Sequence, residues 1–122
     1  MSDFTELDVW KKAHALVLEV YKLSVGFPRE ERFRLTDQLC RSASSIPANI
    51  AEGKGRNSRK EYVQFLYNAR GSLEETKYHL IRAKDLNYLV PEYATKLMER
   101  YDEVGRMLNG LINPLKRRSP HV

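Results

Sequence analysis

The side chains best suited to chemistry in this sequence are its histidines, its cysteine and its clustered cations. Glu75 and His79 stand four residues apart, so a helix would place them on one face. Helical bundles that bind two metal ions use Glu-x-x-His pairs on facing helices, a spacing that this sequence lacks. We therefore interpret His79 as a polar or interfacial side chain, and we expect neither a metal site nor a cofactor.

Cys40 is the single cysteine, which excludes an intrachain disulfide and a multi-cysteine metal site. No histidine stands near it in its own segment to activate the thiol, so a buried, unreactive thiol is favoured. The glycine-containing stretch at 53–56 lacks the spacing of a phosphate-binding P-loop. These observations predict that the protein is not an enzyme.

Basic residues are concentrated in two stretches of the chain. The formal net charge is +5, and residues 30–60 alone carry seven basic and four acidic side chains, a net charge of +3. A second excess lies at Lys116-Arg117-Arg118. Such asymmetry is typical of a protein with a polyanionic partner, although a solvated, solubilising face explains it equally well.

An anion-binding site is the strongest functional candidate. Arg59 and Lys60 stand at a predicted helix start, where free N–H groups and the helix dipole favour anions. The alternative is a charged loop paired with Glu52 and Glu61. If the cluster binds anions, the predicted nucleic-acid-binding residues are Arg41, Lys54, Arg56, Arg59, Lys60, Lys116, Arg117 and Arg118.

Four amphipathic segments must position these residues. Apolar side chains recur at spacings of three and four, the pattern of helices that bury one face. Short links between them predict an all-α, antiparallel, up-down-up-down four-helix bundle over residues 1–115, with residues 116–122 as a basic, flexible tail. The helices are expected at about residues 7–25, 29–52, 58–85 and 91–113.

Individual residues refine this expectation. Ser58 and Glu61 form a predicted capping box at the start of the third helix. Pro47 is expected to kink the second helix without breaking it, because the apolar spacing continues past it. Gly71 indicates close contact between helices, and Pro114 is expected to end the fourth helix.

Self-association is favoured by a second seam on the fourth helix. Met98, Gly105 and Ile112 follow a seven-residue spacing and exceed what one bundle core requires. The alternative is that these positions are half-buried at the bundle edge.

No apolar run reaches the ~18 residues of a membrane span, and the N-terminus does not have the pattern of a secretory signal. A cytoplasmic protein with no membrane partner is therefore expected.

A longer motif points to a family. Residues 45–53 read SIPANIAEG, with WKKAH at residues 10–14 and GSLE at residues 71–74. With these motifs, the chain from about Phe4 to Leu89 resembles the four-helix bundle proteins encoded in 23S rRNA intervening sequences.

The resemblance implies a bacterial, cytoplasmic protein that assembles as a ring-like homopentamer. The related accessory proteins of diversity-generating retroelements imply a basic surface that binds nucleic acid and a reverse transcriptase, so a protein-assembly adaptor is the alternative to RNA binding. The family offers no catalytic residues to transfer. We place Asn49, Glu52 and Arg56 either in a functional site or, for Asn49 and Glu52, in a structural role at the end of the second helix.

Overall fold

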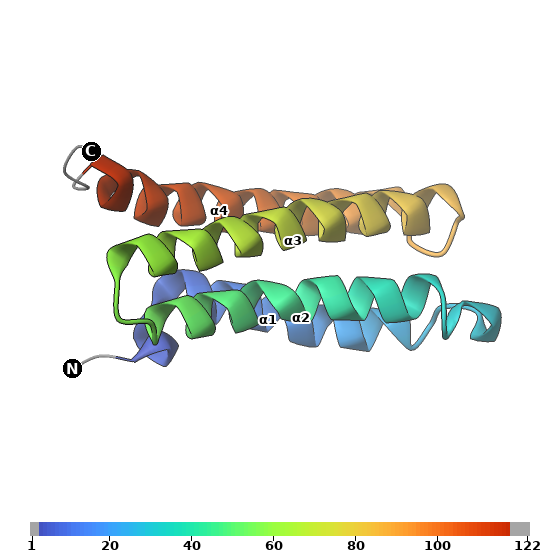
Figure 1. Ribbon diagram of the computed structural model, residues 1–122. Helices are drawn as coiled ribbons and strands as arrows, with labels where there is room; N and C mark the ends of the chain where they lie inside the picture. The colour runs from blue at the N-terminus through green and yellow to red at the C-terminus, as the bar shows by residue number, and fades with distance from the viewer. Residues whose placement is uncertain (1–2, 118–122) are drawn as a thin grey trace.

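The spacing of apolar residues produces four helices that alternate in direction. The computed structural model describes residues 3–117 and contains α1 (Asp8–Ser24), α2 (Leu35–Lys54), α3 (Arg59–Asp85) and α4 (Pro91–Arg117). Figure 1 shows that α1 and α3 run one way while α2 and α4 return, so the start of α1 and the end of α4 lie at the same end of the bundle as the α2–α3 connection. The predicted all-α four-helix fold is confirmed.

The predicted inner faces meet in one core. Leu16 and Val20 of α1, Leu80 of α3 and Leu108 of α4 are all fully buried. The apolar stripe on α2, which has the predicted spacing of three and four, is buried along its whole length. That stripe consists of Leu35, Leu39, Ala43, Ile46 and Ile50.

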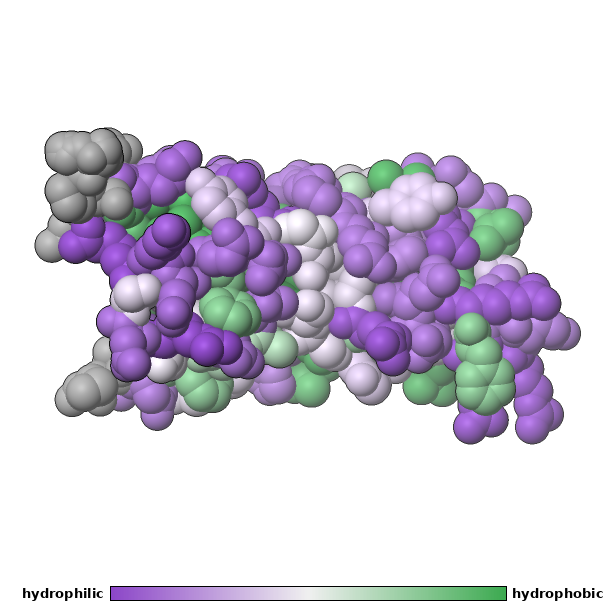
Figure 2. Space-filling view, in the orientation of Figure 1, coloured by the Kyte–Doolittle hydropathy of each residue, from purple (hydrophilic) through white to green (hydrophobic). Residues whose placement is uncertain are grey.

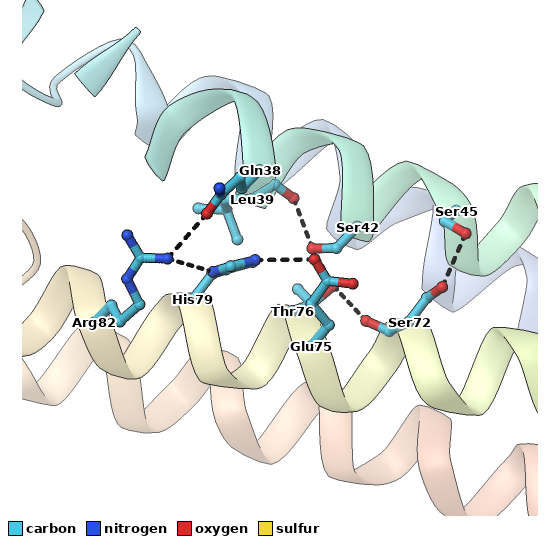
Figure 3. A network of polar contacts seen from close by, with 9 residues as sticks. All are labelled: Gln38, Leu39, Ser42, Ser45, Ser72, Glu75, Thr76, His79 and Arg82. Atoms are coloured by element: carbon cyan, nitrogen blue, oxygen red, sulfur yellow. Dashed lines mark hydrogen bonds and ion pairs between the residues drawn. The ribbon is translucent and has the colours of Figure 1, made fainter. Parts of the chain in front are cut away.

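A row of small hydroxyl side chains joins α2 to α3. Thr76 Oγ1 lies 2.8 Å from Ser42 Oγ, and Ser72 Oγ lies 2.8 Å from Ser45 Oγ. Figure 3 shows these contacts spaced along the two facing helices. Because small side chains occupy this seam, the two backbones approach each other closely.

The second helix begins later than predicted. Residues Arg29–Glu31 form a separate 3-10 turn, and the backbone of Arg34 (φ −122°, ψ −108°) is not helical. A carboxylate oxygen of Glu31 then accepts the backbone N–H of Leu35 at 3.3 Å, which satisfies one free donor of the new helix. The helix continues through Pro47 to Lys54, so the proline does not break it.

The predicted end of the fourth helix at Asn113–Pro114 is wrong. Helix α4 continues to Arg117 with Pro114 inside it. A proline removes only one backbone N–H, and Leu115 still packs against the core beyond it. Lys116 and Arg117 therefore extend a helix, whereas the rest of the predicted tail lies outside the described residues.

Two expectations about helix contacts are also wrong. Gly71 is exposed, and a Cβ atom built there would meet nothing within 4 Å. The seam assigned to self-association fits the alternative better, because Ile112 is only 1% exposed and both Met98 and Gly105 are half-buried at the bundle edge. Gly105 faces a methyl group of Leu73, so α4 is turned toward α3.

The opposite end of the bundle is closed by contacts between its two connections. Tyr88 donates its hydroxyl hydrogen to Glu31 Oε2 at 2.9 Å, and its ring lies 5.6 Å from that of Phe27. Asn87 has a positive φ of 67°, which turns the chain out of α3. None of the described helices is long and apolar enough to cross a lipid bilayer.

Candidate nucleic-acid interface

Predicted basic residues from two distant parts of the sequence meet in one groove. Because α3 and α4 are antiparallel, the start of α3 lies beside the end of α4 (Figure 1). Between them is an open groove of about 310 Å³, which we call the cationic groove. It is lined by Arg59, Lys60, Val63, Gln64, Tyr67, Leu115 and Lys116.

The composition of the cationic groove distinguishes it from other grooves on the bundle. Its lining includes three cations and no carboxylate. Glu103 lies in one groove between α1 and α4, Asp8 in another, and Glu99 and Asp102 in a groove between α3 and α4. In the space-filling view, hydrophilic side chains surround a recessed hydrophobic area at the end where α4 terminates (Figure 2). Among these four grooves, the cationic groove is therefore the one best suited to an anion.

An aromatic ring lies among these cations. The half-buried ring of Tyr67 has the guanidinium carbon of Arg70 at 4.8 Å from its centroid and the ammonium of Lys116 at 5.8 Å. Both distances are within the range of cation–π attraction. The side chains of two helices thus form one aromatic and cationic surface.

Two contacts hold α3 against α4 along this side. Arg70 donates to Asn109 Oδ1 at 2.8 Å, and Lys77 Nζ lies 2.6 Å from Asp102 Oδ1. The hydrogen bond to Asp102 raises the pKa of Lys77, whereas partial burial opposes that shift. The ammonium of Lys77 therefore stays charged at neutral pH and stabilises the pairing that shapes the groove.

The start of α3 is fixed by the residue predicted to cap it. Ser58 has an extended backbone, and its hydroxyl oxygen accepts the backbone N–H of Glu61 at 3.1 Å. This confirms the serine half of the predicted capping box. Arg59 and Lys60 are the first two residues of α3, where the helix dipole adds a partial positive charge.

The predicted residues of the α2–α3 connection have partners of their own. Arg56 forms an ion pair with Glu52 at 2.7 Å and lies 4.7 Å above the ring of Phe65. Asn49 donates its side-chain N–H to the Ser45 carbonyl at 2.8 Å. These contacts favour the structural reading of Asn49 and Glu52, and they leave Arg56 beside the groove rather than in its lining.

Not all predicted site residues come together. Arg41 stands thirteen residues before Lys54 on α2, which at ~1.5 Å per residue separates them by about 20 Å along the helix. Lys54 is half-buried in the last turn of α2. Arg117 is the last residue of α4, and Arg118 lies outside the described residues.

Sequence reasoning missed Tyr67 and Arg70. Tyr67 follows Lys60 by seven residues, a spacing that puts both on one helix face two turns apart. This spacing could have indicated a surface shared by Tyr67 and Lys60, but an aromatic residue at helical spacing is more often a core residue. What could not be read from the sequence is the placement of Lys116 beside this ring, because it requires the pairing of α3 with α4.

The other candidates for chemistry lie in structural contacts. His79 is buried in the α2–α3 seam, with Nε2 at 3.1 Å from Glu75 Oε2 and Nδ1 at 3.1 Å from Arg82 (Figure 3). Since Arg82 can only donate, Nδ1 accepts and Nε2 carries the hydrogen. Cys40 Sγ lies 3.7 Å from Ser24 Oγ. Residues 3–117 include no group of three or more His, Cys, Asp or Glu side chains able to hold a metal ion.

Comparison with known proteins places this geometry in context. A family model described as "23S rRNA-intervening sequence protein" matches residues 5–110. A solved structure from Bacteroides thetaiotaomicron, described as a protein of unknown function from the S23 ribosomal protein family, is similar with a TM-score of 0.77 and 26% identity. The match covers 86% of this chain and 98% of that one. A comparison with curated proteins gives no match.

Proposed function

We propose that this chain, which belongs to the 23S rRNA-intervening sequence protein family, is a non-enzymatic bundle that binds nucleic acid. The contact surface is the cationic groove together with the neighbouring α2–α3 connection. The observation that carries this proposal is the convergence of Arg59, Lys60 and Lys116 on a groove whose lining lacks a carboxylate.

The physical basis is the replacement of counterions on a phosphate backbone. Each cation that contacts a phosphate releases a condensed counterion, so affinity is highest at low salt. Contacts of this kind position a nucleic acid without reading its sequence. The groove therefore supports binding that is salt-sensitive and largely independent of sequence.

Charge reversal within the groove tests the proposal. The double substitution Lys60→Glu and Lys116→Glu changes two exposed side chains of the groove lining. Binding of a labelled structured RNA, measured by fluorescence anisotropy at low salt, should weaken at least ~10-fold, because two attractive phosphate contacts become repulsive.

A matched control changes the same amount of charge elsewhere. Lys11→Glu with Lys12→Glu alters two exposed lysines of α1, in a groove that already contains Glu103. This variant should retain most of the affinity. Equal loss in both double variants would reduce the effect to net charge and contradict a defined site, as would undetectable binding by the unmodified protein.

Self-association is a second part of the proposal. Because the α4 seam is buried or half-buried in the bundle, the support comes from the outer face of α1. Leu18 and Tyr21 on that helix, and Val25 directly after it, follow a spacing of three and four and are 59%, 54% and 85% exposed. A helical stripe of exposed apolar side chains is typical of a contact with another helix. The homopentamer implied by family resemblance stays a prediction for the number of copies.

Light scattering tests this part. The unmodified protein should have a solution mass of at least twice the 14.2 kDa of one chain, and Leu18→Lys with Val25→Lys should reduce it to that of a single chain. A monomeric unmodified protein at micromolar concentration would contradict self-association. It would leave the cationic groove as a site on a single chain.

A further inference from the structure

We infer that the cationic groove binds an unpaired nucleobase stacked against Tyr67, with the adjoining phosphates contacted by Lys60 and Lys116. The inference deepens the proposed function, on which it rests, because it specifies single-stranded segments as the ligand. The basis of the inference is geometric, because an aromatic ring and two lysines line a recess between two helices.

The ring of Tyr67 is the stacking surface. Every base has a π face, so stacking on an aromatic side chain is tolerant of sequence. Arg70 is held near the ring by its hydrogen bond to Asn109. Lys116 is exposed in the last turn of α4, so its ammonium is free to leave the ring for a phosphate when a base takes its place.

The remaining walls suit the faces and edges of a base. Val63 and Leu115 supply apolar surface for a flat ring. Gln64, whose amide nitrogen lies 3.3 Å from Asn68 Oδ1, supplies hydrogen-bonding groups at the edge. The volume of about 310 Å³ is at the small end of ligand sites, which fits one base and not a duplex.

A preference for single strands follows. In an A-form duplex the bases are stacked on one another and unavailable to an aromatic side chain, whereas loops and ends can present them outward. A duplex can therefore contact the groove only through phosphates. The groove should hold a single strand through phosphates and stacking together.

The test compares two RNA probes with substitutions at one residue. A short oligouridylate and an RNA duplex of equal length are titrated with Tyr67→Leu and Tyr67→Phe proteins by fluorescence anisotropy. Leucine preserves the apolar packing of the half-buried side chain but removes its π face, whereas phenylalanine retains the face. Stacking predicts that Tyr67→Leu weakens oligouridylate binding by about 5- to 150-fold, while Tyr67→Phe stays near the unmodified protein.

A second tyrosine on the same helix serves as the control. Tyr78 is exposed and also lies beside a guanidinium, that of Arg82 at 5.7 Å, but it is outside the groove. Tyr78→Leu should bind both probes as the unmodified protein does, and Tyr67→Leu should weaken oligouridylate binding more than duplex binding. Circular dichroism and thermal unfolding show that each variant is folded.

The possible results distinguish base stacking on Tyr67 from the proposed binding of nucleic acid by the cationic groove. Oligouridylate binding that is unchanged in Tyr67→Leu overturns the stacking inference, as does equal affinity of the unmodified protein for both probes. In either case salt-sensitive binding that Lys60→Glu with Lys116→Glu abolishes keeps the proposed function in place. Binding of neither probe by the unmodified protein overturns both.

Discussion

Gly53 of α2 lies so close to Phe65 of α3 that a Cβ atom at position 53 would stand 2.8 Å from Phe65 Cβ. The same atom would be 3.0 Å from the ring of Tyr62. Phe65 Cβ is attached directly to the backbone of α3, so rotation of its side chain gives no relief. This contact sets the distance between the two helices beside their connection, where the candidate interface begins.

Gly53→Ala should therefore destabilise the protein. Overpacking of a tight contact costs about 1–3 kcal/mol, which exceeds the ~0.5–1 kcal/mol gained when alanine replaces a helical glycine. The free energy of unfolding measured by urea denaturation tests this. The control is Gly71→Ala on α3, where the added methyl group meets nothing and should stabilise by about 0.5–1 kcal/mol. Equal effects at both positions would contradict the close contact.

Tyr101 carries a buried hydroxyl without a hydrogen-bond partner among the described residues. Burial raises the pKa of this phenol, which is consistent with a hydroxyl removed from water. An unsatisfied buried polar group costs about 1–3 kcal/mol, so Tyr101→Phe should be neutral or raise the free energy of unfolding by up to ~1 kcal/mol. A free energy of unfolding that falls by more than about 1 kcal/mol in Tyr101→Phe, measured by denaturant unfolding, would show that the hydroxyl has a hydrogen-bond partner.

The hydroxyl pair of Ser42 and Thr76 should contribute measurably to the α2–α3 seam. Both side chains are buried, and their oxygens lie 2.8 Å apart. A double-mutant cycle with Ser42→Ala and Thr76→Val isolates the interaction, for which we expect a coupling of about 0.5–1.5 kcal/mol. Additive effects of the two substitutions would show that each hydroxyl is satisfied separately by the nearby backbone carbonyls.

Alkaline pH should weaken the contact between α1 and α4 through Tyr93. Burial, and then the hydrogen bond that its hydroxyl donates to Glu19, raise the pKa of Tyr93 to about 12. An unfolded tyrosine ionises near pH ~10, so between about pH 10 and about pH 12 the unfolded chain releases a proton that the native chain retains. The stabilisation is therefore complete below about pH 10 and is lost as the pH rises toward about pH 12.

Substitution at this contact gives the check. In Tyr93→Phe, the free energy of unfolding should fall less between about pH 9 and about pH 11 than in the unmodified protein. Glu19→Gln should reduce the fall only in part, because burial is the larger cause of the shift. Identical pH dependence in Tyr93→Phe and the unmodified protein would contradict the assignment.

Much of the fold could be predicted from the sequence because the apolar spacing is regular. The buried stripe from Leu35 to Ile50 has the predicted spacing of three and four, and the predicted serine cap is found at Ser58. The helix ends were harder to predict, since they depend on single contacts. The Glu31 carboxylate accepts the N–H of Leu35, the first residue of α2. Leu115 packs against the core, and α4 continues beyond Pro114.

The candidate site was predictable only in part. Its cations are visible in the sequence, but their grouping depends on which helices are neighbours. Arg41 and Lys60 look equally relevant along the chain, yet only Lys60 lines the groove. The glycines also show that helix contacts cannot be read from the sequence alone. The sequence predicts close packing at Gly71, whereas the tight contact lies at Gly53.

The salt dependence of RNA binding tests the central claim most directly. If Lys60 and Lys116 each contact one phosphate of a single strand, the slope of log affinity against log salt should decrease in magnitude by ~1.4 in Lys60→Gln with Lys116→Gln. Lys11→Gln with Lys12→Gln should keep the slope of the unmodified protein. A slope that is the same in all three proteins would contradict phosphate binding by the cationic groove.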